Sequence, residues 1–196
     1  ILEHCVEKGY AKNIDIHYNT NGTQLPQQEI FDLWSHFKRV EVAFSIDDVG
    51  EQFEYQRHPA KWIEVNQNLL KFKERQTENM EFQICSTINI FNIFSLAKLA
   101  MWARQFKPRF FYVNTCFDPD IFNIQTLPKQ IKDIVNERYG NLKDFEGTLR
   151  YMNSADRDSQ GIREFRKQRI LKADAYRKEN FRDTFPLLNN ILKIYE

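Results

Sequence analysis

The sequence predicts an α/β protein with an open parallel sheet of about four strands, or part of a larger (β/α) barrel, with flanking helices and extra C-terminal helices. Three observations predict this class. Apolar strand-like and amphipathic helical segments alternate over residues 1–116, as in βα units joined by right-handed crossovers. The 196 residues suit one domain around one core, and no linker-like stretch or repeat divides 1–196. Four strands are too few for an eight-stranded barrel of about 250 residues.

The first elements are predicted from periodicity and from turn residues. Residues 1–10 read as the end of a helix with one apolar face, and Gly9 is its stop signal. Residues 14–18 alternate apolar and polar side chains, which favours a strand. Pro26 opens a helix to about Phe37, with apolar residues at helical spacing.

The middle of the chain continues this alternation. Residues 40–46 form a β-branched and aromatic run, so a second strand is expected. Pro59 introduces a helix to about Lys73 with one apolar side. A third strand is predicted at 80–90, and a helix follows at 91–106.

The alternation ends after the fourth predicted strand, at 109–116. Its continuous apolar run predicts burial on both faces of the sheet. Only helices are predicted after it, at 128–139, 141–151, 159–176 and 180–195, the last interrupted at Pro186.

Composition excludes several classes of protein. Hydrophobic residues make up 42% and the net charge is +1, so a disordered chain and a general nucleic-acid binder are not expected. The richest apolar stretch, 96–103, contains Lys98 and is too short to span a membrane. The three cysteines are an odd number without a CxxC motif, which argues against a disulfide framework and favours a reducing, cytoplasmic setting.

Polar residues follow every predicted strand, at 19–23, 45–48, 86–89 and 114–116. Ligands of parallel α/β sheets bind beyond the carboxyl ends of the strands, so this rim suits a polar small molecule. The Asp47 carboxylate suits two ribose hydroxyls, and the Arg57 guanidinium suits a carboxylate. The same residue types are ordinary in turns and helix caps, so a structural interpretation stays open.

Four strings resemble the radical S-adenosylmethionine (SAM) enzymes, most closely the branch with SPASM or twitch auxiliary domains. YNTNGT at 18–23, FSIDDVGEQFEYQR at 44–57 and STINIFN at 86–92 match that family's TNG turn, S-x-D strand end with a following arginine, and (T/V)-x-N strand end, in order. LKADAYRKENFRDTFPLL at 171–188 resembles the D-x-x-R-x-x-x-F…FP stretch of phage and marine twitch-type members.

The resemblance implies a partial (β/α)6 barrel, represented here by its later strands. It implies that Ser45 and Asp47 contact the SAM ribose, that Arg57 lies near the methionyl carboxylate, and that Asn21 and Asn89 lie near SAM. The family cleaves SAM reductively at a [4Fe–4S] cluster to generate a 5′-deoxyadenosyl radical, which abstracts a substrate hydrogen. The cofactor carries that chemistry while the protein orients it.

The sequence departs from the family where the cluster should bind. The C-x-x-x-C-x-x-C loop is absent, as is the GGE-type strand, and both would precede Ile1. We therefore expect the C-terminal part of a longer parent, or a fragment, that alone binds no cluster and has no radical activity. No catalytic residue is assigned, and the parent's substrate is expected to be a small molecule or a peptide.

A non-catalytic α/β module that binds a ligand or a protein partner is the alternative. The same polar rim would then meet the partner, and an exposed sheet edge would allow self-association. The four histidines show no metal-ligand spacing, so no metal site is predicted, and His17 is expected to point into the barrel or to pair locally.

Residues 163–182 carry eight Lys and Arg against three Asp and Glu. A solvated helix face is the favoured interpretation, and contact with RNA, a nucleotide-bearing substrate or an acidic partner is the alternative.

Overall fold

The computed structural model describes residues 1–195 and confirms the predicted α/β class. Its strands are β1 (Asp15–Thr20), β2 (Arg39–Ser45), β3 (Met80–Ile88) and β4 (Phe110–Thr115). Its helices are α1 (Leu2–Glu7), α2 (Gln28–Trp34), α3 (Glu51–Gln56), α4 (Trp62–Arg75), α5 (Leu96–Gln105), α6 (Lys129–Tyr139), α7 (Glu146–Asn153), α8 (Gln160–Arg177), α9 (Phe181–Thr184) and α10 (Pro186–Leu192).

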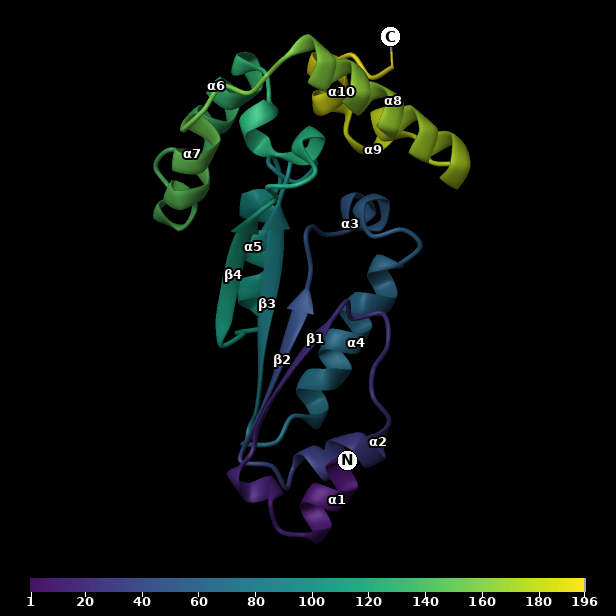
Figure 1. Cartoon of the computed structure of the whole chain (residues 1–196), viewed down its shortest axis with the longest axis vertical. Helices are drawn as coiled ribbons and strands as arrows, with labels where there is room; N and C mark the ends of the chain where they lie inside the picture. Colours follow the sequence, from purple (N-terminus) through teal and green to yellow (C-terminus); the bar gives the residue numbers. More distant parts are fainter. Residues whose placement is uncertain (196) are drawn as a thin grey trace. The chain divides into compact units, whose positions relative to one another are not determined.

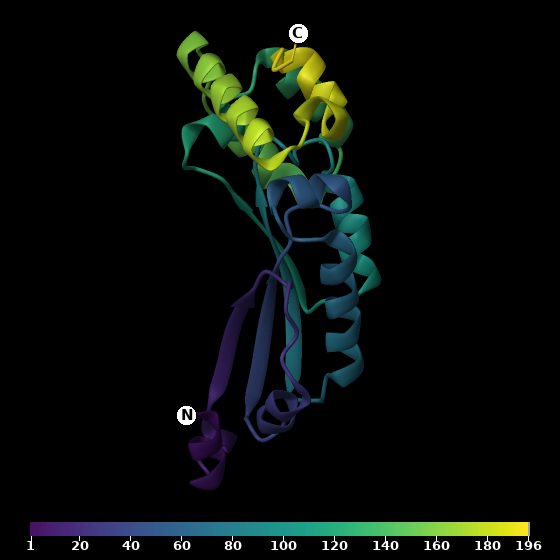
Figure 2. The ribbon, with the colours of Figure 1, turned by 90° about the vertical axis from the view of Figure 1, so that its right-hand side faces the viewer.

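The four strands form one parallel sheet in the order β1-β2-β3-β4 (Figure 1). Tyr18 is in register with Val42, and Val40 with Met80. Because each strand is added on the same side of the previous one, right-handed crossovers send the intervening helices to the same face. Figure 2 shows α4 and α5 together on one side of the sheet.

Aromatic side chains join the sheet to its helices. Phe72 of α4 lies 5.4 Å from Phe44 of β2 and 6.0 Å from Phe82 of β3, measured between ring centroids. Phe31 of α2 lies 5.6 Å from the same Phe72 ring. Side chains in β3 alternate between buried and half-buried, as a strand with one covered face requires. The core therefore sits between this face of the sheet and helices α2, α4 and α5.

The opposite face of the sheet is polar, and we call His17, Arg39, Glu41, Glu81 and Gln83 its polar face. Its side chains bond across three strands: Glu41 accepts from His17 at 2.8 Å and from Gln83 at 3.2 Å, and it also bonds Arg39. Arg39 reaches Glu81 at 3.1 Å. His17 therefore points to this face and pairs locally, as its alternation with Ile16 and Tyr18 predicts.

The expectation that 109–116 is buried on both faces is wrong. Phe110 and Tyr112 in β4 are 54% and 49% exposed, and burial alternates along the strand. β4 is an edge strand, and Phe111 faces the aromatic core while its neighbours face away. The run of apolar residues therefore predicted the strand, but only one face of that strand is buried.

The other predicted elements are present, although the helices expected from 91 and from 141 begin at Leu96 and Glu146. Short 3-10 helices at Ala11–Asn13, Asp120–Phe122, Ile124–Thr126 and Lys143–Phe145 were not predicted. The short helix α3 was not predicted, because six residues hold too little periodicity to reveal it. Gly50 precedes it with φ of +66°, a conformation that suits glycine. The helix expected from Pro59 begins at Trp62.

The described chain divides into two compact units. The first comprises residues 1–86 and 98–113, and the second comprises 87–97 and the chain from Asn114 onward. None of the helices described over residues 1–195 has the length and apolar character needed to cross a bilayer.

The second unit is helical and has its own aromatic core. The Phe91 ring lies 5.2 Å from Phe122 and 5.6 Å from Phe185. Asp174, only 2% exposed, accepts hydrogen bonds from the Phe181 N–H and the Tyr195 O–H, both at 2.7 Å. Two residues of the D-x-x-R-x-x-x-F…FP stretch thus hold the C-terminal helices in place.

Candidate functional site

The structure brings together two of the predicted ligand residues at the carboxyl end of β2. After β2 the chain passes through Asp47 and Asp48 into α3, whose end places Arg57 beside Asp47. Nε and Nη2 of Arg57 lie 2.7 and 2.6 Å from Oδ2 of Asp47. Asp47 is 7% exposed, and the side chain of Arg57 is 31% exposed. The ten-residue spacing therefore encodes a direct ion pair.

This pairing changes the chemistry expected of the two residues. Sequence reasoning treated Asp47 and Arg57 as separate contacts for a ligand, and it missed that each is a partner of the other. Two donors on one carboxylate oxygen form a strong charge-assisted contact. A ligand at this end of β2 meets a preorganised carboxylate–guanidinium pair.

Asp48 is fully buried and stabilises the loop between β2 and α3. Its Oδ1 accepts from the Val49 N–H at 2.9 Å, and its Oδ2 lies 3.3 Å from the Gln56 amide nitrogen. The carboxylate therefore ties the start of the loop to the end of α3. Sequence reasoning did not assign this role to Asp48, because the role depends on α3, which was too short to predict.

Ser45 is the last residue of β2 and is in register with Cys85 of β3. By alternation from buried Phe44 it lies on the same face of the sheet as Glu41. Burial and the nearby Glu41 raise the pKa of the Cys85 thiol. Cys85 is therefore a protonated thiol at neutral pH, and the thiolate is the form that binds metals.

Asn21 has a local structural role in the TNG turn. Its Oδ1 accepts from the Thr23 N–H at 3.1 Å and from the Thr23 hydroxyl at 2.7 Å. Gly22 has φ of +75°, and a Cβ there would lie 2.9 Å from Val65 of α4. Asn68 of α4 donates to the Gly22 carbonyl at 2.9 Å. Packing against α4 explains this turn without any ligand.

Asn89 belongs to the second unit and also shapes a turn. Its Oδ1 accepts from the Phe91 N–H at 2.8 Å, and its own N–H donates to Asn92 at 2.9 Å. Asn92 is fully buried and donates to the Thr87 carbonyl at 2.9 Å. These hydrogen bonds explain the asparagines of residues 86–92 by the conformation of the turn that follows β3.

The carboxylate of Glu41 is the hub of the polar face. Burial alone would raise its pKa, but hydrogen bonds from His17 and Arg39 outweigh that effect and lower it. Glu41 therefore stays ionised at neutral pH. Sequence reasoning placed His17 but did not find this network, because its members come from three strands.

Metal ligands are not gathered over residues 1–195: these residues contain no group of three or more His, Cys, Asp or Glu side chains that could hold a metal ion. Cys5, Cys85 and Cys116 form no disulfide with one another. The described residues therefore do not fit an iron–sulfur cluster.

No protein-family model matches the chain, and the comparison with curated proteins found no match.

Proposed function

We propose that the chain is the C-terminal part of a radical SAM enzyme core, supplying later strands of a partial (β/α) barrel. The observation that carries this proposal is the sequential parallel order β1-β2-β3-β4 with helices on one face. Doubly wound sheets reverse their strand order and carry helices on both faces. A barrel keeps one direction of strand addition, with helices outside and side chains inside.

The polar face supports this assignment. In a barrel wall the outer face packs on helices, as the Phe44, Phe72 and Phe82 cluster does. The inner face meets substrate, and the network around Glu41 suits that role. The substrate class that we assign to the parent is a small molecule or a peptide, acted on in the cytoplasm.

The Asp47–Arg57 pair fits SAM. A buried carboxylate accepts hydrogen bonds from ribose hydroxyls, and a half-buried guanidinium pairs with the methionyl carboxylate. Ser45 lies two residues before Asp47 and completes the family's S-x-D pattern. Asn21 and Asn89 hold the turns that follow β1 and β3.

When bound in the parent, SAM supplies a carbon radical on reductive cleavage at the [4Fe–4S] cluster. Since the described residues do not gather cluster ligands, we assign cluster binding to another part of the parent. The task of this chain is to bind and orient SAM and to shield it from water.

Titration calorimetry of the chain with SAM and with 5′-methylthioadenosine tests these roles, because the second ligand lacks the carboxylate. We expect Arg57→Gln to weaken SAM binding about tenfold, the value of one charge-assisted hydrogen bond, and to weaken 5′-methylthioadenosine less, because only the orientation of Asp47 changes for that ligand. Asp47→Asn should weaken both ligands, because both carry the ribose.

Lys61→Gln is the matched control, since Lys61 pairs with Glu54 at 2.9 Å in a neighbouring exposed ion pair. Circular dichroism checks that each variant is folded. Unchanged SAM affinity in Asp47→Asn and Arg57→Gln, or no binding by the unaltered chain, would count against the assignment.

The second candidate is a non-catalytic interaction module that self-associates. β1 is an edge strand in the order described, and Asp15, His17, Tyr18 and Asn19 along it are exposed. Unpaired backbone groups at such an edge are a template for another strand.

If this candidate is right, light scattering after size exclusion will show a dimer at micromolar concentration. Asn19→Lys should shift it to the monomer by placing a charge on the edge strand. Asn141→Lys makes the same change at an exposed turn of the second unit and should leave the dimer intact. A monomer for the unaltered chain at every concentration excludes self-association.

A further inference from the structure

The second unit contains a cavity of about 420 Å³. Its polar lining comes from Gln130 of α6, Arg163 and Arg166 of α8, and Lys193 just after α10. Its apolar lining includes Ile191 and Leu192. The volume is in the range typical of small-molecule sites. Three cationic side chains and no acidic one line it.

Arg166 is the unusual member of this lining, because it is only 1% exposed. Its Nε donates to the Ile121 carbonyl at 2.8 Å. Its Nη2 donates to the Thr126 carbonyl at 3.0 Å and to the Thr126 hydroxyl at 2.6 Å. Its Nη1 has no hydrogen-bond partner among the residues described. A buried cation bound to neutral acceptors, with one donor nitrogen unused, is costly unless an anion joins it.

Burial lowers the pKa of Arg166 to about 10, the nearby Asp158 opposes this shift, and Arg163 adds to it. Arg166 therefore keeps its charge at neutral pH. Arg163 lies one helical turn before Arg166 and bonds Asp158 through Nε at 2.8 Å. Asp158 is bound by Arg163 through both Nε and Nη2 and influences Arg166 only through its charge. One carboxylate therefore faces two guanidinium groups, and the pair of arginines retains excess positive charge.

The start of α6 adds partial positive charge to the same cavity. Pro128 precedes the helix and Gln130 lies in its first turn, and both line the cavity. The first N–H groups of a helix have no acceptor within it and carry the positive end of the helix dipole. Such a helix start is suited to bind anions when other donors converge on it.

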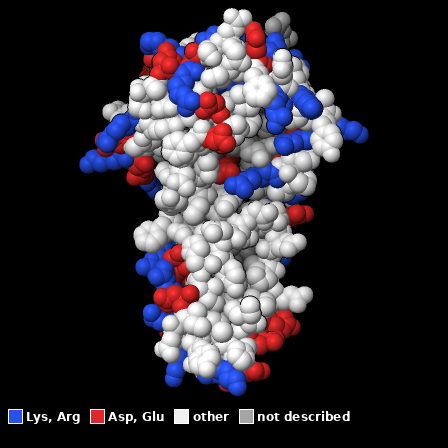
Figure 3. Space-filling view, in the orientation of Figure 1, with Lys and Arg blue, Asp and Glu red and all other residues white. Residues whose placement is uncertain are grey.

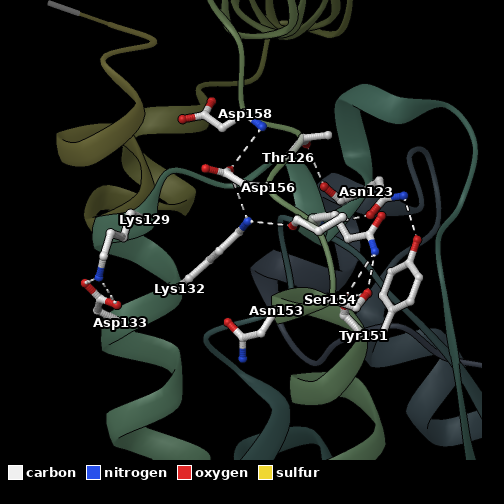
Figure 4. A network of polar contacts seen from close by, with 12 residues as sticks. Asn123, Thr126, Lys129, Lys132, Asp133, Tyr151, Asn153, Ser154, Asp156 and Asp158 are labelled. Carbon is white, nitrogen blue, oxygen red and sulfur yellow. Dashed lines mark hydrogen bonds and ion pairs between the residues drawn. The ribbon is translucent and has the colours of Figure 1, made fainter.

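The neighbouring cations of α6 are engaged with other acceptors (Figure 4). Lys129 bonds Asp133 at 2.7 Å. Lys132 donates to the Ala155 carbonyl at 3.2 Å and lies 3.5 Å from Asp156. Over the helices of this unit, basic and acidic side chains are interspersed on the face seen in Figure 3. The charged side chains on that face therefore form no continuous basic surface.

We propose that this cavity binds the phosphate group of a small phosphorylated molecule. Arg163, Lys193 and the first N–H groups of α6 supply the donors, and Arg166 adds positive charge to the lining. A phosphate offers more oxygens and more charge than a carboxylate, which matches three cations and a helix start. Ile191, Leu192 and Ile194 form a wall for the organic part of the ligand.

The probes are inorganic phosphate, phenyl phosphate and acetate, titrated into the full chain by calorimetry at constant ionic strength. We expect phenyl phosphate to bind more tightly than inorganic phosphate, because it also covers the apolar wall. Acetate should bind more weakly than either. Equal affinity for phenyl phosphate and inorganic phosphate would overturn the organic part of the proposal. Acetate binding as tightly as phosphate would overturn the choice of phosphate.

Lys193→Asn is the informative variant. Lys193 is exposed and has φ of 52°, a left-handed conformation that Asn also tolerates, so the fold should survive the change. We expect phosphate affinity to fall about tenfold, as for one lost charge-assisted hydrogen bond. Lys172→Asn removes the same charge from an exposed position on α8 outside the cavity and should change affinity little. Equal affinities in the two variants would refute the site.

Arg166→Met tests the buried positive charge, and its folding is checked by circular dichroism because Ile121 and Thr126 lose a partner. If folded Arg166→Met binds phosphate as tightly as the unaltered chain does, the site is refuted as well. A loss of phosphate binding in the folded variant supports it.

Discussion

Phe72→Ala is expected to lower the free energy of unfolding by about 3–5 kcal/mol, the range for a large aromatic side chain removed from a packed core. Phe72 is 1% exposed and is the ring on which three others meet. Phe31, Phe44 and Phe82 lie 5.6, 5.4 and 6.0 Å from it. Alanine would leave a cavity between the sheet and α4 that the strands cannot close by moving.

Urea unfolding followed by circular dichroism measures this effect. Leu70→Ala is the matched control, because Leu70 lies on the same helix but is 45% exposed, and its loss should cost less than about 1 kcal/mol. A similar destabilisation in both variants would mean that α4 does not hold the sheet through Phe72.

Asp174→Ala is expected to destabilise the second unit by about 2–4 kcal/mol. The carboxylate is 2% exposed and accepts from the Phe181 N–H and the Tyr195 O–H. Alanine would leave both donors without this acceptor. Asp183→Ala, at an exposed position on α9, should change stability little, and thermal unfolding of the two variants gives the comparison.

The Asp174–Tyr195 contact also predicts a dependence of stability on pH. Burial, and the hydrogen bond to the Asp174 carboxylate, raise the pKa of Tyr195 from 10.0 to about 12. The phenol therefore stays protonated in the folded state after it has ionised in the unfolded state. Its contribution to stability is complete below about pH 10 and is lost as the pH rises toward 12.

Tyr195→Phe should remove this alkaline loss of stability, measured by urea unfolding between neutral and alkaline pH. Tyr176→Phe should keep it, because Tyr176 is 88% exposed. Identical profiles for the unaltered chain and Tyr195→Phe would show that the phenol does not couple to folding.

Much of the fold could be predicted because its local signals agree. Alternation in 80–90 and helical spacing in 59–73 reflect side chains that meet the same core, so periodicity located both elements. The apolar residues of 109–116 predicted a strand but did not show which of its faces is buried. Whether Phe110 and Tyr112 are covered depends on what lies against that face, which the strand itself does not encode.

The candidate site was predictable only in part. Position after a strand identified Asp47, and spacing identified Arg57, as residues at one end of the sheet. Their direct contact depends on α3, which was too short to predict. Asn21 carries the same kind of motif, yet its oxygen is used within its own turn. A motif names residue types, and hydrogen-bond geometry decides what they contact.

The burial of Arg166 was decided by the tertiary structure and could not be predicted from the sequence. The sequence by itself determined a basic helical segment, the order of strands and helices, and the polar residues after each strand. It placed Arg166 among eight similar charges expected to face solvent. Only the tertiary structure buried this one, against Ile121 and Thr126. Periodicity tells which residues share a face of a helix, whereas burial depends on which distant segment packs against that face.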